Sequence, residues 1–299
     1  MSSAFSSLIS ELNPDNFRIL PRLISLIENQ AENRILLESI PSRNIPVIGI
    51  TGPPGAGKST LLSAMIEYLR KQDKRIAVLA VDPSSAFSQG SVLGDRIRMQ
   101  NHYLDKEVFI RSIANRGYLG GLSAASSDIV SILQAFSFDY IFLETVGVGQ
   151  SEIEIASMAS CVVVVLVPES GDEIQSIKAG LIEIADILVV NKADREGAGK
   201  LFGILASMLH EKDDQGNTGL VKTIAEQNQG IDDLWIEILN QLSKAPKEKR
   251  MERLLERIYQ IVSRKRMENF NKESIAQRLR ERMDLPNFNL YAFIREIEP

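Results

Sequence analysis

The sequence predicts an α/β fold in which a mainly parallel sheet is covered by helices on both faces. Short runs of β-branched residues recur along the chain, and most of them are separated by stretches with helical periodicity. The runs are continuously apolar, as expected for strands of a parallel sheet that are buried on both faces. A glycine-rich segment with the spacing of a phosphate-binding loop follows the first run. The predicted strands are residues 47–50, 76–81, 108–113, 140–143, 161–167, 187–190 and 221–225.

Helical extensions are predicted at both ends of this central domain, which we expect to span residues 45–245. Residues 1–44 carry Leu, Ile and Phe at mixed spacings of three and four, typical of amphipathic helices. Beyond the central domain the composition shifts to Lys, Glu, Arg and Met. This shift predicts helices at 247–268 and 272–283 and a short tail within the extension 246–299.

The C-terminal extension has two interpretations. It could be a solvated helix pair that packs back on the central domain, or it could be a contact between two copies of the chain. We favour the subunit contact, because the central domain already closes on its own. The apolar residues that would form this contact are Leu254, Leu255, Ile258, Ile261 and Val262.

Composition narrows the classes of protein that fit. The chain has 299 residues with a net charge of -5, so it offers no overall basic field for nucleic acid. The longest strongly apolar run, residues 161–167, is far shorter than the ~20 residues of a membrane span. Cys161 is the single cysteine and there are two histidines, His102 and His210, which argues against disulfides and zinc clusters. We therefore expect a cytoplasmic protein without a targeting peptide that binds neither nucleic acid nor membrane.

The glycine-rich segment matches the P-loop pattern G-x-x-x-x-G-K-[ST] and stands between a predicted strand and a predicted helix. Glycines let backbone N–H groups converge on a polyphosphate, and the helix N-terminus adds its dipole. Lys58 can reach the β and γ phosphates, and the Ser59 hydroxyl can bind Mg²⁺. An accidental glycine-rich turn is the competing interpretation, which the strand, loop and helix order disfavours. The predicted fold is therefore that of a P-loop NTPase with a G domain, and the nucleotide-binding residues are Gly52, Pro53, Pro54, Gly55, Ala56, Gly57, Lys58, Ser59 and Thr60.

A second motif predicts guanine as the base. Asn191, Lys192 and Asp194 follow the strand 187–190 in the pattern N-K-x-D, where P-loop GTPases bind the base. A carboxylate at this place accepts hydrogen bonds from the N1–H and the exocyclic amine of guanine, which adenine cannot supply. An ordinary polar turn is the alternative. After the last strand we expect the backbone N–H of Ala225 to assist, so the predicted cofactors are GTP or GDP with Mg²⁺.

Glu144 begins the segment Glu-Thr-Val-Gly at the end of a strand, where GTPases carry D-x-x-G. Its carboxylate can hold a metal-bound water, and the Gly147 N–H can sense the γ-phosphate. The next residue is Val148, at a position where Ras-like proteins have a glutamine that orients water. We therefore expect slow intrinsic hydrolysis, unless Gln150 or a partner supplies the group.

Two further carboxylates are candidates at the metal. Asp82 ends the second predicted strand, and Asp95 lies in the following segment beside two arginines. A magnesium ion on a triphosphate needs only one or two protein oxygens, so either residue could complete the set. We assign Ser59, Asp82 and Glu144 to the metal and place Asp95 among the catalytic candidates, with an exposed loop aspartate as the alternative interpretation.

Together these motifs resemble the MeaB-type proteins, formerly called ArgK, whose human relative is the methylmalonic aciduria type A protein. The resemblance covers about residues 15 to 265. It implies a GTP-hydrolysing chaperone that gates adenosylcobalamin loading and protects or reactivates methylmalonyl-CoA mutase or a related acyl-CoA mutase. It also implies a homodimer formed by the C-terminal helices and a low GTPase rate stimulated by the mutase. The segments that carry the resemblance are 52–60, 81–85, 90–96, 117–121, 144–152 and 191–194.

Two loops have switch roles in the proteins that this chain resembles. The segment from about Asp82 to 99 looks like the first switch. Residues 168–178 look like an additional switch that reports the nucleotide state to the mutase, with Lys178 as a candidate for contacting the catalytic centre. Many members have Gly-Ala-Gly after the proline, where this chain has Glu169, Ser and Gly171. The catalytic candidates are thus Lys58, Asp95, Glu144 and Lys178.

Three other functions remain open at this point. Nickel metallochaperone GTPases resemble the chain in fold, but they deliver metal through Cys and His ligands, which are scarce here. A small-molecule kinase that uses ATP would need an acceptor pocket with a base and a site that tolerates adenine. A nucleotide-binding module without hydrolysis is the third. The relative affinities for ATP and GTP and a turnover assay with a mutase separate these functions.

Overall fold

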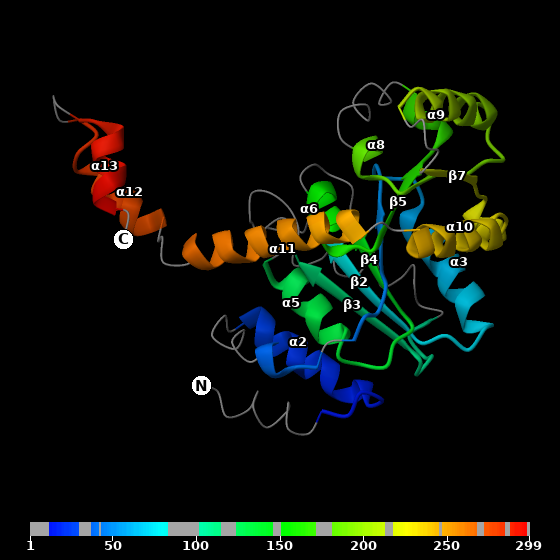
Figure 1. The fold of residues 1–299 in the computed structure, drawn as a ribbon, viewed down its shortest axis with the longest axis horizontal. Coiled ribbons are helices and arrows are strands. Elements are labelled where there is room, and N and C mark those ends of the chain that lie inside the picture. The colour runs from blue at the N-terminus through cyan, green and yellow to red at the C-terminus, as the bar shows by residue number, and fades with distance from the viewer. Residues whose placement is uncertain are drawn as a thin grey trace. The chain divides into compact units, whose positions relative to one another are not determined.

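The computed structural model confirms the predicted fold class: a parallel sheet of seven strands lies between two layers of helices (Figure 1). The structure describes residues 12–29, 37–41, 43–82, 102–114, 124–145, 151–171, 181–212, 218–244, 247–267, 272–284 and 288–297.

Every strand pair of the sheet is parallel, and the strand order is β3-β2-β4-β1-β5-β6-β7. The chain runs from β1 to β2 on one side and from β5 to β6 on the other, so β1 and β5 form the point where the winding direction reverses. Ligands of open α/β sheets bind at the carboxyl ends of strands at such a point. The strands are β1 (Val47–Thr51), β2 (Ile76–Asp82), β3 (Val108–Ala114), β4 (Tyr140–Thr145), β5 (Cys161–Leu166), β6 (Ile187–Val190) and β7 (Gly219–Lys222).

Two apolar cores, one on each face of the sheet, explain why the strands read as continuous apolar runs. Successive strand residues point to opposite faces, so Val162 belongs to one core and Val163 to the other. The first core is covered by α2 (Leu20–Asn29), α5 (Ala124–Leu133), α6 (Ser151–Met158), α8 (Leu181–Ile184) and α9 (Ala198–Lys212). The second core is covered by α3 (Lys58–Arg70) and α10 (Ile231–Lys244).

The N-terminal helix α2 is part of the domain core. Its residues Leu20, Leu23, Ile24 and Ile27 are all fully or almost fully buried. Their spacing of three and four places them on one face, which packs with buried residues of α5. A short 3-10 turn, η1 (Phe17–Ile19), precedes α2 and begins at Asn16, whose side chain accepts from the Arg18 N–H.

The chain divides into two compact units, residues 1–253 and 254–299, and the division falls inside α11 (Lys247–Met267). The second unit also contains α12 (Lys272–Arg280) and α13 (Leu290–Ile297). The prediction of a short tail after residue 283 missed α13. The missed signals are Asn289, whose side chain caps the Ala292 N–H, and an apolar residue at 290, 293, 294 and 297.

The last strand begins two residues earlier than predicted and ends three residues earlier, at Lys222. The Thr223 N–H still donates to the Val190 carbonyl, but the Ile224 N–H turns to the Gln229 carbonyl. Ala225 therefore begins a 3-10 turn, η5 (Ala225–Gln227), and is not a strand residue. Among the described residues, no helix is both long enough and apolar enough to span a membrane.

Candidate functional site: a P-loop cavity

The turn after β1 depends on glycine at two close approaches. Gly52 has φ 140°, and a Cβ there would stand 2.1 Å from the Val165 carbonyl oxygen of β5. Gly57 has φ 85° and caps α3, and a Cβ there would stand 2.5 Å from the Asn191 amide nitrogen. Only glycine tolerates both the backbone angle and the lack of space. The same two glycines keep the chain close to β5 and to the loop after β6.

Lys58, the first residue of α3, folds back over the loop that precedes it. Its Nζ donates to the carbonyl oxygens of Gly52 at 2.7 Å and Pro53 at 3.0 Å. The residue is 7% exposed, so its positive charge lies inside the turn. A buried ammonium requires such oxygen partners, and phosphate oxygens are partners of the same kind.

Ser59 and Glu144 form a buried pair at the ends of α3 and β4. The Ser59 hydroxyl donates to the Glu144 carboxylate at 2.7 Å. Directly beside them, the Thr145 hydroxyl donates to Thr51 at 2.9 Å. The end of β4 is therefore bonded to the start of α3 through Glu144 and to the end of β1 through Thr145. Sequence reasoning missed the threonine pair, because two distant threonines carry no motif.

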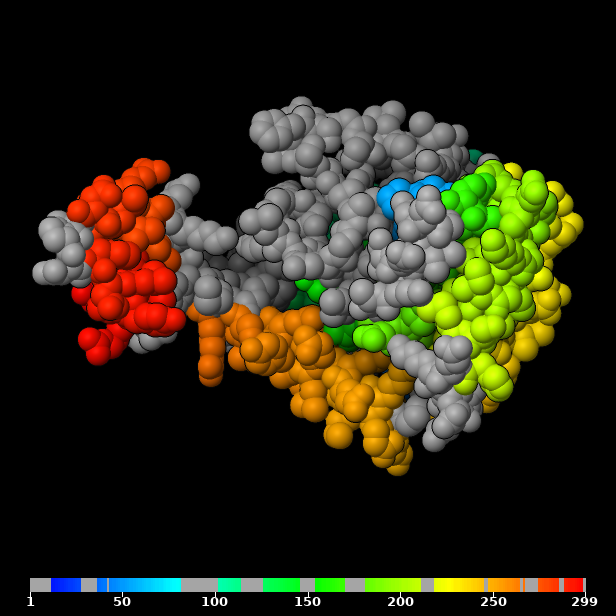
Figure 2. Space-filling model, turned by 90° about the horizontal axis from the view of Figure 1, so that it is seen from above, coloured from blue at the N-terminus to red at the C-terminus, as the bar shows by residue number. Residues whose placement is uncertain are grey.

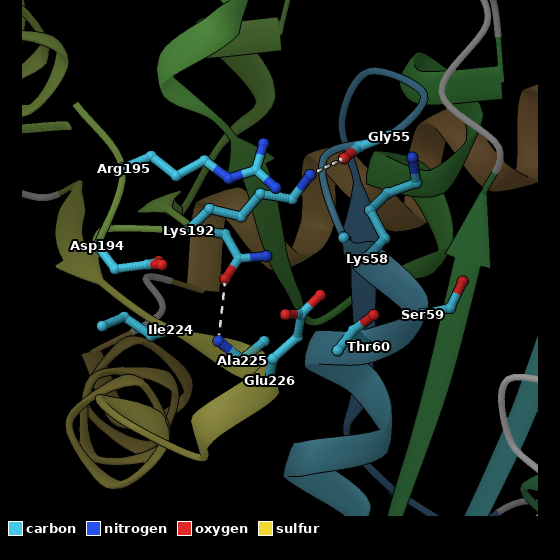
Figure 3. A pocket seen from close by; sticks show the side chains of 12 residues that line it. Gly55, Lys58, Ser59, Thr60, Lys192, Asp194, Arg195, Ile224, Ala225 and Glu226 are labelled. Carbon is cyan, nitrogen blue, oxygen red and sulfur yellow. Dashed lines mark hydrogen bonds between the residues drawn. The ribbon is translucent and has the colours of Figure 1, made fainter. Parts of the chain in front are cut away.

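Asn191 connects three segments of the site. Its amide nitrogen donates to the Ala56 carbonyl of the P-loop at 2.9 Å. Its amide oxygen accepts from the Thr223 hydroxyl at 3.0 Å and from the Ala225 N–H at 3.2 Å (Figure 3). Asn191 and its three partner residues are all buried. The predicted base-binding motif, the P-loop and the turn after β7 are therefore fixed to one another.

These segments enclose a cavity of about 280 Å³, close to the lower end of the ~300–1,000 Å³ typical of ligand pockets. Lys192 crosses one side and donates to the Gly55 carbonyl at 2.9 Å (Figure 3). In the space-filling view the blue surface around the P-loop borders the green surface of the chain after β5 (Figure 2). The lining residues are Gly55, Gly57, Lys58, Ser59, Thr60, Asn191, Lys192, Asp194, Arg195, Ile224, Ala225 and Glu226.

Most of the nucleotide-binding residues predicted from the sequence line this one cavity. Gly52, Pro53 and Ala56 are not among its lining residues, but their carbonyls accept the hydrogen bonds from Lys58 and Asn191. Pro54 does not line it either. Asp82 stands at the carboxyl end of β2, and nothing is described of its side chain. Asp95, Gly147 and Lys178 lie outside the described residues.

Three lining residues, Arg195, Ile224 and Glu226, were not predicted as site residues. Arg195 forms an ion pair with Glu169 of the turn η4 (Pro168–Gly171), which follows β5. Hydrogen bonding to Arg195 lowers the pKa of Glu169, and the same bond raises the pKa of Arg195, so both are charged at neutral pH. Their adjacency to Asp194 and Ala225 in the sequence is the signal that could have found Arg195 and Glu226.

Of the three candidate metal ligands, Ser59 and Glu144 have side chains that the structure describes. Ser59, which lines the cavity, and Glu144, its hydrogen-bond partner, supply one hydroxyl and one carboxylate oxygen that lie 2.7 Å apart. Oxygen donors of this kind suit Mg²⁺, which takes few protein ligands when a polyphosphate supplies others. In the described part of the chain, no three His, Cys, Asp or Glu side chains converge as a metal cluster. The residues present fit a magnesium ion that is bound together with phosphate.

Of the three side chains that could act as soft metal ligands, Cys161 and His102 are buried and His210 is exposed on α9. Cys161 lies in β5, and burial raises the pKa of its thiol well above the usual range. A thiol that stays protonated is a poor metal ligand. His102 contacts the Ser63 hydroxyl at 2.9 Å, and burial lowers the pKa of its imidazole. Neither residue lines the P-loop cavity.

The parallel sheet, the glycine-rich turn after β1 and the N-K-x-D segment after β6 define a P-loop NTPase with a G domain. Residues 20–282 match the family described as methylmalonyl Co-A mutase-associated GTPase MeaB. The chain belongs to this family, which confirms the resemblance found in the sequence.

Individual relatives agree with this assignment. A Pyrococcus abyssi protein named as a GTPase is 47% identical over 269 residues, covering 86% of this chain and 83% of the relative. The mouse mitochondrial methylmalonic aciduria type A homolog is 38% identical over 194 residues, covering 63% of this chain and 47% of that protein. Among solved structures, the crystal structure of an LAO/AO transport system kinase has a TM-score of 0.69 at 25% identity and covers 99% of this chain and 97% of its own.

Proposed function

We propose that the chain binds GTP and GDP with Mg²⁺, hydrolyses GTP slowly, and acts as a chaperone of an adenosylcobalamin-dependent acyl-CoA mutase. The family description names methylmalonyl-CoA mutase, and the mouse relative is named after methylmalonic aciduria. Both names favour methylmalonyl-CoA mutase as the client. In this proposal the GTPase gates cofactor loading and protects or reactivates the mutase, and two copies of the chain form the working dimer.

The observation that carries the nucleotide assignment is the position of Asn191. It bonds the P-loop through Ala56 and the turn after β7 through Ala225, so phosphate-binding and base-binding segments face one cavity. Asp194 lines that cavity from the same loop. A carboxylate there pairs with the edge of guanine, whereas adenine would present the wrong pattern of donors and acceptors.

The mechanism needs no covalent step by the protein. Lys58 exchanges its carbonyl partners for the β and γ phosphates and offsets their charge. Ser59 and Glu144, with Asp82, would hold the magnesium ion, and this ion would supply positive charge that offsets the negative charge of the phosphates. The chain has no polar side chain at Val148 to orient water, so we expect the partner to organise the switch segments and speed up hydrolysis.

Nucleotide affinities test the base assignment. We expect wild-type protein to bind GTP at least tenfold more tightly than ATP and Asp194→Asn to lose most of this preference, because its amide cannot accept both guanine hydrogen bonds. Lys58→Ala should abolish binding or turnover. Isothermal titration with GTP and with ATP measures these affinities for the wild-type protein and each variant. The control variant is Lys71→Ala, which replaces an exposed lysine at the end of α3. Tight ATP binding with weak GTP binding would instead support a kinase.

Client recognition needs a separate experiment. We expect co-purification from the native host to capture an acyl-CoA mutase and expect that mutase to raise the GTP turnover of the chain. The catalytically impaired Lys58→Ala variant should bind the mutase without stimulated turnover. Turnover that is unaffected by every captured mutase would remove the chaperone assignment and leave the GTPase assignment in place.

A further inference from the structure

Arg195 occupies a special place at the base-binding end of the cavity. It follows Asp194 directly, and its backbone N–H donates to the Lys192 carbonyl at 3.0 Å in a tight turn. Its side chain extends over the cavity and lines it, while remaining 48% exposed (Figure 3). The guanidinium is half-exposed, and Arg195 shares the cavity wall with the carboxylate of Asp194, the residue proposed to bind the edge of the base.

Glu169 limits the positions that this guanidinium can take. It belongs to η4, on a different segment from Arg195, and accepts a hydrogen bond from the Arg195 guanidinium. Exposed ion pairs contribute little to stability, because solvent screens them and two side chains lose freedom. The pair is therefore better explained by the orientation it gives to Arg195 than by its contribution to folding.

The opposite side of the base-binding region is apolar. Ile224 and Ala225 also line the cavity, and in the view of Figure 3 Ile224 and Arg195 lie on opposite sides of Asp194. A planar purine held at its edge by Asp194 would thus have an aliphatic side chain on one face and a guanidinium on the other. Guanidinium groups stack favourably on aromatic planes because they are flat, delocalised and weakly hydrated.

We infer that Arg195 stacks on the purine ring of the bound nucleotide and that Glu169 is a positioning residue that holds the guanidinium over the ring. This inference rests on the proposed function, because it assumes that the cavity binds a guanine nucleotide. A contact with the base is common to GTP and GDP, so it strengthens the binding of both nucleotides to the same degree. It also links the nucleotide to η4.

Equilibrium binding of GDP and GTP tests the inference. We expect Arg195→Ala to weaken both by about tenfold, the range of a single stacking or cation–π contact. Glu169→Gln keeps the shape of the side chain and should weaken both by about threefold. In the Arg195→Ala background, Glu169→Gln should have no further effect, because the residue that it positions is gone.

Matched controls separate the possible failures. Lys200→Ala removes an exposed cation of α9 that does not line the cavity, and it should bind within twofold of wild type. Affinities of Arg195→Ala within twofold of wild type would overturn the inference. So would a loss that is several times larger for GTP than for GDP, which indicates a phosphate contact. Wild-type protein that binds neither nucleotide would instead refute the proposed function, and unchanged thermal unfolding of the variants excludes misfolding.

Discussion

At the scale of single residues, the hydroxyl pair Thr51 and Thr145 joins the two strands that carry the P-loop and Glu144. Both side chains are almost completely buried. When a buried hydroxyl loses its hydrogen-bond partner, the free-energy cost of removing it from water is no longer offset by a hydrogen bond. The pair therefore matters more for the alignment of β1 and β4 than its single hydrogen bond suggests.

Replacing Thr145 with the isosteric valine tests this role. We expect Thr145→Val to lower the free energy of unfolding by about 1–2 kcal/mol, because Thr51 loses its buried donor. The double variant Thr51→Val with Thr145→Val should be less destabilised than the sum of the two single variants. Urea denaturation measures all three, and strictly additive losses would show that the two hydroxyls do not interact.

His102 predicts a pH dependence of stability. Burial lowers the pKa of its imidazole below the ordinary value of about 6.5, and this effect exceeds the opposing influence of the hydrogen bond with Ser63 and of the charges of Glu67 and Asp105. The unfolded chain therefore binds the proton more readily than the folded chain. Stability is retained above about pH 6.5 and falls as the pH drops from there toward the lowered folded pKa.

The matching measurement compares melting temperatures at pH 7.5 and 5.5. We expect the wild-type protein to lose more thermal stability over this interval than His102→Gln, which cannot take up the proton. Carboxyl groups with lowered pKa values, such as that of Asp105, are protonated only at more acidic pH. Their contribution to stability is therefore unchanged between pH 7.5 and 5.5. Parallel profiles for the two proteins would contradict the assignment to His102.

At the scale of elements, Asp186 attaches the start of α11 to the sheet. Its side chain is 5% exposed and accepts from the Val162 N–H at 2.7 Å and from Arg253 at 2.6 Å, and it also pairs with Lys249. Arg253 donates in addition to the carbonyls of Ala159 and Ser160. The first two turns of α11 are thereby bonded to the beginnings of β5 and β6.

Removal of the Asp186 carboxylate should destabilise the folded protein. We expect Asp186→Ala to lower the free energy of unfolding by about 3–5 kcal/mol, because Arg253 would be left largely buried without its counter-charge. Urea unfolding followed by the fluorescence of the single tryptophan, the buried Trp235, reports this loss. Asp233→Ala, an exposed carboxylate in the first turn of α10, should cost less than about 1 kcal/mol. Equal losses would refute the role of Asp186.

Two element predictions failed, one for the bounds of the last strand and one for the helix α13. The strand predicted at 221–225 is displaced, because the Ile224 N–H bonds to Gln229 and turns the chain away from the sheet. The helix α13 was missed, although its cap and its apolar spacing are visible in the sequence. The pair of Asp186 with Arg253 spans 67 residues and the pair of Arg195 with Glu169 spans 26. No local sequence pattern specifies such pairs.

At the scale of the whole molecule, α11 carries an exposed apolar stripe formed by Met251, Leu254, Leu255, Ile258 and Val262. Each of these side chains is at least 44% exposed. Their spacing of three, one, three and four residues places them along one side of the helix. Exposed apolar surface of this kind is typical of contact sites, which supports the predicted homodimer.

Charge substitutions in the α11 stripe test the dimer. We expect the double variant Leu255→Glu with Ile258→Glu to shift the molecular mass in solution from dimer to monomer, since two carboxylates would be buried without partners. GDP affinity should be unchanged, because the stripe does not line the cavity. Light scattering after gel filtration measures the mass, with Glu252→Ala as the control. A monomeric wild-type protein would refute the dimer.

Most of the fold could be predicted from the sequence, because seven apolar runs, their order and one P-loop leave few possible architectures. The main members of the cavity were predictable for a similar reason: Lys58, Asn191 and Asp194 belong to motifs that stand at the ends of parallel strands. Thr51 and Asp186 were not, because each acts through a distant side chain and belongs to no motif.

The strand β6 has Asp186 just before its first residue and Asn191 just after its last. Four buried residues separate them, hydrogen-bonded in register to β5 on one side and β7 on the other. Such a strand is close to incompressible, since packed interiors yield little to small forces. This short, rigid strand therefore connects the carboxylate that holds the start of α11 directly with the amide that bonds Ala56 and Ala225.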